Sequence, residues 1–283
     1  MPELISLHQC FGGQQRFYRH DSSAIGLPMR FSVFLPTHAD AGPVPVLFYL
    51  AGLTCTEETF MIKAGAQRFA QRHGIMLVAP DTSPRGAGLP GETDHWDFGA
   101  GAGFYLDATQ EPWKRHYRMD SYIVDELFRL VTSELPGDPV RAGIFGHSMG
   151  GHGALVLALR NPDKFRSVSA FAPIAHPVDC PWGHKAFGNY LGPDREAWKR
   201  YDATELMRAA QCPFPGGILV DQGLADPFLE PQLRPEAFEA ACRAAGQPLE
   251  LRRHAGYDHG YYFISTFMED HLAFHAQALG ASA

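Results

Sequence analysis

One serine lies between glycines where an apolar run gives way to a helical pattern. The stretch 144–155 reads Ile-Phe-Gly-His-Ser-Met-Gly-Gly-His-Gly-Ala-Leu, with Ser148 at its centre. A serine hydroxyl is a weak nucleophile, so an enzyme must hold it in a sharp turn, within reach of an imidazole that takes its proton. Flanking glycines leave room for that turn, which is known as a nucleophile elbow. We therefore predict that Ser148 is the nucleophile of an acyl-transfer reaction.

Such a serine requires an acid and then a histidine on later loops. A strand pattern ends at Asp221, and the loop after it contains Asp226, so either aspartate could orient an imidazole. We favour Asp226, which lies deeper in the loop, and expect Asp221 to fix the loop through local hydrogen bonds. As the base we favour His259, in the loop 256–260, because it follows the acid in the required order.

The other histidines near these motifs are given no role in proton transfer. His271 and His275 lie four apart in a helical pattern, a spacing that metal ligands use, but no third ligand accompanies them. We interpret both as part of an ordinary helix face and expect no metal. His147 and His152 flank the serine and are expected to project elsewhere.

Two backbone N–H groups are candidates for the oxyanion hole. Met149 follows the nucleophile at the start of a helix, and the second donor should come from the loop after an early strand, 51–59. Gly52 permits a tight turn there, so the N–H of Leu53 is the expected partner of the Met149 N–H. Cys55 lies in the same loop; we predict a bystander thiol that borders the substrate entry.

The wider pattern alternates apolar β-rich runs with helical segments. Strands are predicted at 30–35, 46–51, 75–79, 140–146, 167–171, 217–221 and 249–253, and helices at 59–73, 121–135, 151–160, 235–245 and 261–279. This alternation predicts one α/β domain over 1–283, with a mostly parallel central sheet and helices on both faces. Active sites of such sheets lie beyond the carboxyl ends of the strands, where the serine is found.

Two long stretches, 80–119 and 172–200, are expected to be irregular. Both are rich in glycine, proline and aromatic residues, and bulky rings stay ordered by burying themselves. We predict that these stretches wall a pocket, with Trp182 among the substrate-binding residues.

Charge and composition narrow the class of partner. The chain has 283 residues, with 24 Lys and Arg against 31 Asp and Glu, a net charge of −7. That balance disfavours nucleic acid and anionic membranes and favours a small-molecule substrate. No leader pattern and no apolar run of about 20 residues are seen, so a cytoplasmic location is expected. The five cysteines are scattered, so we expect most of them to be buried thiols rather than parts of a zinc site or disulfide scaffold.

Four motifs together resemble the S-formylglutathione hydrolases, also called esterase D. They are the stretches 52–58, 146–154, 221–228 and 256–263, and further similar stretches lie at 80–86, 103–109 and 180–183. The resemblance spans nearly the whole chain. It implies a homodimeric, cytosolic serine hydrolase of the α/β-hydrolase fold that converts S-formylglutathione to glutathione and formate without a cofactor. Matched motif by motif, it implies nucleophile Ser148, acid Asp226 and base His259, with Leu53 and Met149 as oxyanion donors.

Such a substrate would need local positive charge. Glutathione carries about −1 at pH 7, and the chain is also negative. Cations in the first long stretch are therefore candidates to bind it: Arg85, Lys114, Arg115 and Arg118.

Two other functions remain open. A general carboxylesterase or acyltransferase could use the same triad, because fold and triad do not select an acyl group. A binding protein on a hydrolase scaffold could have lost catalysis, although Ser148, Asp226 and His259 are all present.

Overall fold

The fold is built on one nine-stranded sheet, seen in a computed structural model that describes residues 2–281. The strand order is β1-β2-β3-β5-β4-β6-β7-β8-β9. The strands are β1 (Glu3–Cys10), β2 (Gly13–Asp21), β3 (Pro28–Leu35), β4 (Val44–Leu50), β5 (Met76–Pro80), β6 (Gly137–His147), β7 (Phe165–Phe171), β8 (Ile218–Gly223) and β9 (Leu249–His254). Pairing is antiparallel from β1 through β3 to β5, and parallel from β5 through β4 to β9.

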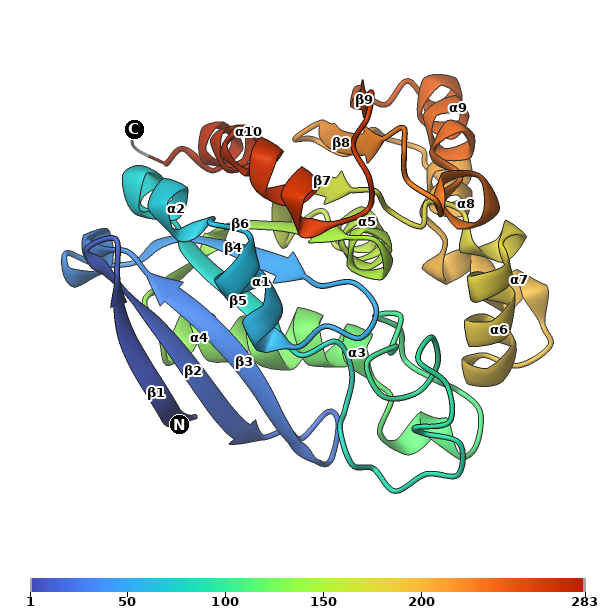
Figure 1. Cartoon of the computed structure of the whole chain (residues 1–283), viewed down its shortest axis with the longest axis horizontal. Coiled ribbons are helices and arrows are strands. Elements are labelled where there is room, and N and C mark those ends of the chain that lie inside the picture. Colours follow the sequence, from blue (N-terminus) through green and yellow to red (C-terminus); the bar gives the residue numbers. More distant parts are fainter. Residues whose placement is uncertain (1, 282–283) are drawn as a thin grey trace.

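Helices cover both faces of the sheet (Figure 1). They are α1 (Glu57–Lys63), α2 (Gln67–His73), α3 (Met119–Ser121), α4 (Phe128–Ser133), α5 (Met149–Arg160), α6 (Pro181–Tyr190), α7 (Arg195–Trp198), α8 (Ala203–Ala209), α9 (Pro235–Ala245) and α10 (Tyr261–Leu279). Helices α1, α2 and α10 lie on one face, and α4 and α5 lie on the other. The predicted α/β architecture is confirmed. None of the helices in residues 2–281 combines the length and apolar content needed to cross a bilayer.

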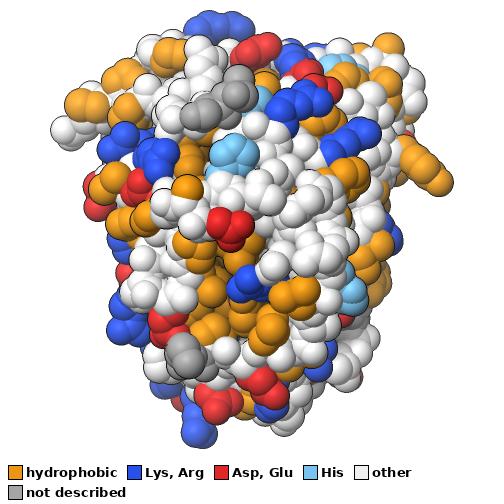
Figure 2. Space-filling model, turned by 90° about the vertical axis from the view of Figure 1, so that its left-hand side faces the viewer, with side chains coloured by type: hydrophobic (Ala, Val, Ile, Leu, Met, Phe, Trp, Pro, Cys, Tyr) orange, Lys and Arg blue, Asp and Glu red, His pale blue; other side chains and the backbone are white. Residues whose placement is uncertain are grey.

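The sequence pattern did not predict the first two strands, β1 and β2. Most residues of β1 are exposed, including Leu4, Ile5 and Leu7, so the strand shows no clean alternation between a buried and a solvent face. On this side of the molecule apolar side chains lie among charged ones (Figure 2). The seven predicted strands are all present, with ends that shift by a few residues.

Two predicted segments differ from the structure. The single helix expected over 59–73 is two helices, α1 and α2, divided near Gly65, whose φ of +65° a helix cannot accommodate. The stretch 172–200, expected to be irregular, contains α6 and α7. Here Pro181 occupies the first position of α6, where the missing N–H costs no hydrogen bond.

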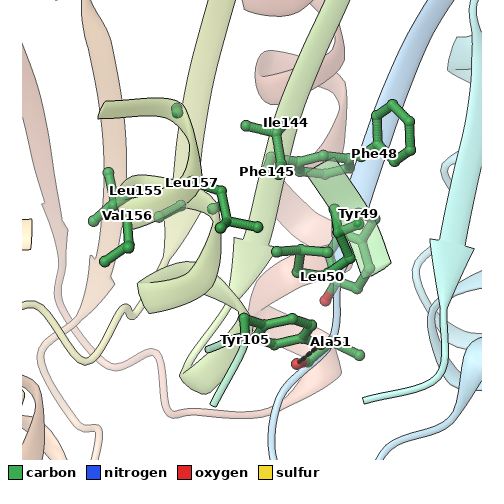
Figure 3. Close-up of a cluster of buried hydrophobic side chains, with 14 of the residues drawn as sticks. Phe48, Tyr49, Leu50, Ala51, Tyr105, Ile144, Phe145, Leu155, Val156 and Leu157 are labelled. Atoms are coloured by element: carbon green, nitrogen blue, oxygen red, sulfur yellow. Dashed lines mark hydrogen bonds between the residues drawn. The ribbon is translucent and has the colours of Figure 1, made fainter. Parts of the chain in front are cut away.

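The centre of the sheet supports the turn that carries Ser148. Phe48 and Tyr49 of β4 lie beside Phe145 of β6, and side chains of α5 pack against the same strands (Figure 3). The hydroxyl of Tyr105 donates to the carbonyl of Ala51, 2.8 Å away, and ties the long stretch 80–119 to the end of β4. The functional edge of the sheet is therefore built on fully buried side chains.

Candidate active site

Ser148 connects β6 to α5 in a strained turn. Its backbone has φ +58° and ψ −119°, a combination that residues other than glycine rarely adopt. The Ser148 N–H donates to the carbonyl of Phe171 at 2.9 Å, and its carbonyl accepts from His152 and Ile174. The backbone is thus fixed on both sides. Within residues 2–281 the Ser148 hydroxyl makes no hydrogen bond, so the structure joins His259 to Asp226 but not to Ser148.

Two glycines allow this turn to approach its neighbours. A Cβ atom on Gly150 would lie 1.9 Å from the carbonyl oxygen of Leu50, so only glycine lets α5 start against the end of β4. A Cβ atom on Gly52 would lie 3.3 Å from the Cβ of Ser148. The loop that follows β4 therefore lies close against Ser148.

The structure brings Asp226 and His259 together. Asp226 lies in the loop after β8, its side chain is fully buried, and its Oδ2 is 2.5 Å from Nδ1 of His259. The other carboxylate oxygen accepts the Phe228 N–H at 2.8 Å. Backbone hydrogen bonds of 2.9 Å join Leu224 to His254, the last residue of β9, and Ala225 to Tyr257 in the loop that carries His259. One carboxylate oxygen thus orients the ring and the other holds its own loop.

The ring of His259 is held between two other rings. The ring of Phe228 meets it edge to face, with centroids 4.9 Å apart, and the ring of His147 lies 4.4 Å away. Because His147 directly precedes Ser148, this contact sets the imidazole beside the elbow. The side chain of His259 stays partly exposed, as a proton-transferring group must.

His147 was expected to project elsewhere, and that expectation is wrong. Its side chain is buried against His259, and both ring nitrogens lack a hydrogen-bond partner among the described residues. Burial and the neighbouring imidazole hold the pKa of His147 well below its usual range, so the ring is neutral. His152 does point away, toward the carbonyl of Phe104.

The two proposed oxyanion donors lie on either side of this turn. Met149 is the first residue of α5, so its N–H has no partner within the helix. Leu53 follows the glycine that touches Ser148, and no residue in the described range accepts its N–H. The next residue, Thr54, has φ +69° and donates to Gly101 at 2.9 Å, which fixes the turn.

Cys55 and Arg85 contribute to the same loop. Burial raises the pKa of the Cys55 thiol, so it stays protonated. Its carbonyl accepts from Arg85 at 3.0 Å and from Thr82 at 2.6 Å. The Arg85 guanidinium also forks onto Asp81, with Nη2 2.7 Å from Oδ1. The charge of Arg85 is therefore already neutralised, and this residue braces the loop.

Trp182 lies in a series of rings that ends at His259. Its ring centroid is 4.9 Å from that of Phe228 and 5.7 Å from that of Trp96. Trp182 is buried, whereas Trp96 is 58% exposed. The rings extend from the imidazole to solvent, which fits the predicted aromatic wall.

Lys114 is not brought to this edge of the sheet. With Arg115 and Arg118 it lines a separate hollow of about 830 Å³, which also includes Tyr201. The Tyr201 hydroxyl donates to Asp120, which pairs with Arg160 at the last residue of α5. Since Ser148 precedes the first residue of that helix, the hollow lies toward its far end, about 18 Å along the axis.

A second Ser-His-Asp arrangement is present inside the protein. Ser169 Oγ is 2.8 Å from His271 Nδ1, and His271 Nε2 is 3.2 Å from Asp221 Oδ2. Ser169 Oγ also lies 2.8 Å from Nε2 of His275, whose Nδ1 is 2.7 Å from Ser167. All of these side chains are fully buried. His271 and His275 therefore form a buried polar network, not the ordinary helix face that was expected.

Asp221 joins this network to β9. Its two carboxylate oxygens accept hydrogen bonds from Nε and Nη2 of Arg252, each at 2.6 Å, and Oδ1 lies 3.1 Å from Nε2 of His254. Burial alone would raise the pKa of Asp221, but hydrogen bonds from His271 and Arg252 hold it well below its usual range. The expected local hydrogen bonds within its own loop are replaced by bonds to β9 and α10. Within residues 2–281, no group of three or more His, Cys, Asp or Glu side chains could hold a metal.

A serine at a strand-turn-helix elbow, on the carboxyl edge of a mostly parallel sheet with helices on both faces, defines an α/β-hydrolase. Residues 22–274 match the Esterase family. The chain is 54% identical to mouse S-formylglutathione hydrolase, over 98% of both chains. It is 55% identical to the S-formylglutathione hydrolase of Arabidopsis thaliana, over 97% of both chains. A solved S-formylglutathione hydrolase from Agrobacterium tumefaciens superposes with a TM-score of 0.95 at 49% identity, over 98% of this chain and 100% of that one. The chain belongs to the S-formylglutathione hydrolase family.

Proposed function

We propose that this protein hydrolyses S-formylglutathione to glutathione and formate, with Ser148, His259 and Asp226 as its catalytic triad. The observation that carries the triad is the 2.5 Å contact between His259 and Asp226, with the His259 ring packed against the residue before Ser148. Membership of the family supports the choice of substrate.

In the first half of the reaction, Nε2 of His259 removes the proton of the Ser148 hydroxyl as Oγ attacks the formyl carbon. The carbonyl oxygen becomes an oxyanion, which accepts hydrogen bonds from the N–H groups of Leu53 and Met149. The C–S bond then breaks, and the protonated His259 gives its proton to the departing sulfur. Glutathione leaves as a thiol, and a formyl group remains on Ser148.

In the second half, water takes the place of the thiol. His259 removes a proton from the water as its oxygen attacks the formyl-enzyme, and the same two N–H groups hold the new oxyanion. The bond to Ser148 Oγ breaks, Oγ recovers the proton from His259, and formate leaves. Throughout, Asp226 keeps Nδ1 protonated and stabilises the imidazolium that forms twice in each cycle.

The buried set of Ser169, His271 and Asp221 has no part in this proposal. Ser169 lies within β7, where its fully buried hydroxyl already contacts two imidazole nitrogens. A substrate carbonyl could reach it only by separating the sheet from α10. Its hydrogen bonds stabilise the fold around the site instead.

One kinetic comparison tests the assignment. We expect kcat/KM for S-formylglutathione to exceed that for 4-nitrophenyl acetate by orders of magnitude. A higher value for the aryl ester would favour a general carboxylesterase, and transfer of the acyl group to an added alcohol in preference to water would favour an acyltransferase. A protein that a fluorophosphonate probe does not label would be a binding protein on this scaffold.

We also propose that the protein acts as a homodimer in the cytoplasm. All five cysteines are free thiols, which suits a reducing compartment. The edge strand β1 exposes Leu4, Ile5 and Leu7 next to unpaired backbone groups, a feature that favours pairing with a second chain. Light scattering coupled to size-exclusion chromatography tests the dimer, and a monomer at micromolar concentration would contradict it.

A further inference from the structure

The substrate and the protein carry charge of the same sign, which raises the question of how they bind. Glutathione has two carboxylates and one ammonium, about −1 in total at pH 7, and the chain carries −7. A positive group at the mouth of the site is needed to offset this repulsion. The question arises only if the proposed function holds, so the inference below rests on it.

Lys63 is a cation whose position suits this task. It is the last residue of α1, the helix that follows the oxyanion loop, and its side chain is exposed. Its Nζ lies 5.7 Å from the ring centroid of Tyr261, two residues after His259. The Tyr261 ring lies in turn 6.2 Å from the ring of His147, beside the nucleophile. Two contacts thus link the ammonium group to the elbow.

Lys63 is also free to bind an anion. Among the described residues it has no carboxylate partner, since its contact is the face of an aromatic ring. Other cations near the site are neutralised: Arg85 forks onto Asp81, and Lys185 lies 2.5 Å from Asp97. Lys114 pairs with Glu111 in the hollow toward the other end of α5. Arg85 and Lys114, which the sequence suggested as substrate-binding cations, are therefore already paired with carboxylates.

We propose that the Lys63 ammonium binds a carboxylate of the glutathionyl group at the mouth of the active site. A tripeptide spans at most about 10 Å, a length comparable with the two ring contacts that separate Lys63 from the elbow. The neighbouring side chains, Ile62 and Tyr262, are 70% and 89% exposed and offer apolar surface to the peptide. Lys63 thus selects for an anionic leaving group and takes no part in the chemistry.

A simpler role for Lys63 is structural. A lysine in the last turn of a helix compensates the negative end of the helix dipole. That role predicts lower stability on substitution and the same kinetic effect on every substrate. The substrate-binding role predicts an effect confined to KM of the anionic thioester.

Charge variants assayed on two substrates separate these roles. We expect Lys63→Ala to raise KM for S-formylglutathione about tenfold, the loss of one charge-assisted hydrogen bond, with kcat within about twofold. Lys63→Glu should raise KM further, and Lys63→Arg should keep it near the wild-type value. Hydrolysis of 4-nitrophenyl acetate, which is neutral, should not change. Salt should raise KM of the wild type and leave that of Lys63→Ala nearly constant.

Controls make each outcome decisive. Lys199→Ala removes an exposed lysine that pairs with Glu196, and it should behave as the wild type on both substrates. Equal losses on both substrates in Lys63→Ala, an unchanged KM, or a larger rise of KM in Lys114→Ala would each overturn the proposal. A wild-type protein that fails to hydrolyse S-formylglutathione would instead overturn the proposed function itself.

Discussion

Two groups of residues contain the same three residue types: the elbow set of Ser148, His259 and Asp226, and the buried set of Ser169, His271 and Asp221. They differ in what surrounds the serine. At the elbow, Ser148 has a strained backbone and a hydroxyl without a partner among the described residues, and we propose the N–H groups of Leu53 and Met149 as its oxyanion donors. Inside the protein, the hydroxyl of Ser169 lies in a regular strand between two imidazoles. Hydrogen-bonded Ser, His and Asp side chains are therefore insufficient to define a catalytic site. A reactive serine also needs access to the substrate, a hydroxyl that can give its proton to an imidazole, and donors for the oxyanion.

The buried set shows what the same groups do when they are satisfied. Asp221, His271 and Ser169 connect β8, α10 and β7, and Arg252 extends the connection to β9. These are the elements whose ends carry the acid and the base. The network fixes the frame on which the elbow set is mounted.

The sharpest way to break the comparison is to remove each serine in turn. Ser148→Ala should lower kcat about 10⁵-fold and abolish labelling by a fluorophosphonate, because the nucleophile is lost. Ser169→Ala should keep labelling and a kcat per folded molecule close to that of the wild type. Steady-state kinetics and probe labelling measure both.

The Ser169→Ala variant should instead lose stability. It leaves imidazole nitrogens of His271 and His275 without partners, at a cost of about 1–3 kcal/mol for each unsatisfied group. The exposed Ser133→Ala serves as the matched control, with no change in the denaturation midpoint. If Ser169→Ala lost the probe label while still folded, the two sets would have been assigned the wrong way round.

The next largest effect concerns the oxyanion donors that we propose beside Ser148. Leu53→Pro removes one N–H and should lower kcat about 10²- to 10³-fold. Leu53→Ala keeps that N–H and should stay within a few fold of the wild type. The ratio of the two variants, measured on S-formylglutathione, isolates the hydrogen bond from the side chain. Equal activities of the two variants would remove Leu53 from the oxyanion hole.

Buried histidines predict a loss of stability in mild acid. Burial lowers the pKa of His152 to about 4 and lowers that of His271 and His275, whereas an unfolded chain protonates histidine near pH 6.5. As pH falls below about 6.5, the unfolded state binds protons that the native state does not, so the free energy of unfolding decreases. His152 alone contributes about 3 kcal/mol, which is lost between about pH 6.5 and 4.

Urea denaturation at a series of pH values measures this dependence. Asp120 and Glu57 act in the opposite direction, because burial raises the pKa of both carboxyl groups. The histidines outnumber them, so a net decrease in acid is expected. A free energy of unfolding that stayed constant from neutral pH to pH 5 would contradict the buried, neutral state of these rings.

The smallest expected effect on catalysis comes from one of two buried histidines. The ring nitrogens of His147 have no partners, so His147→Phe keeps the ring against His259 and should leave kcat/KM within about threefold. His271→Phe removes bonds to Ser169 and Asp221 and should destabilise the protein by several kcal/mol. Kinetics and thermal denaturation of both variants measure the difference. A large loss of kcat in a folded His147→Phe variant would assign a chemical role to those nitrogens.

The sequence reveals local motifs far better than contacts between distant segments. Short stretches of sequence were enough to predict the turn at Ser148 and the order of the predicted acid and base. The structure brings those two residues, Asp226 and His259, together. The partners of Ser169 lie about a hundred residues further along the chain, so no local pattern could indicate them. The packing of Lys63 on Tyr261 likewise depends on contact between α1 and α10. For the cations of the stretch 80–119, the sequence showed the charge of each side chain but not the carboxylates with which they pair.

Hydrogen bonds join the loop after β8 to the end of β9 and to the loop after it, and so hold Asp226 and His259 together as one unit. Gly223 lets the two loops touch, since a Cβ there would lie 2.4 Å from the carbonyl oxygen of Tyr257. We therefore expect thermal motion at this edge to move Asp226 and His259 together relative to Ser148. We therefore expect heating to abolish activity by separating His259 from Ser148, at a lower temperature than the one that breaks the contact between Asp226 and His259.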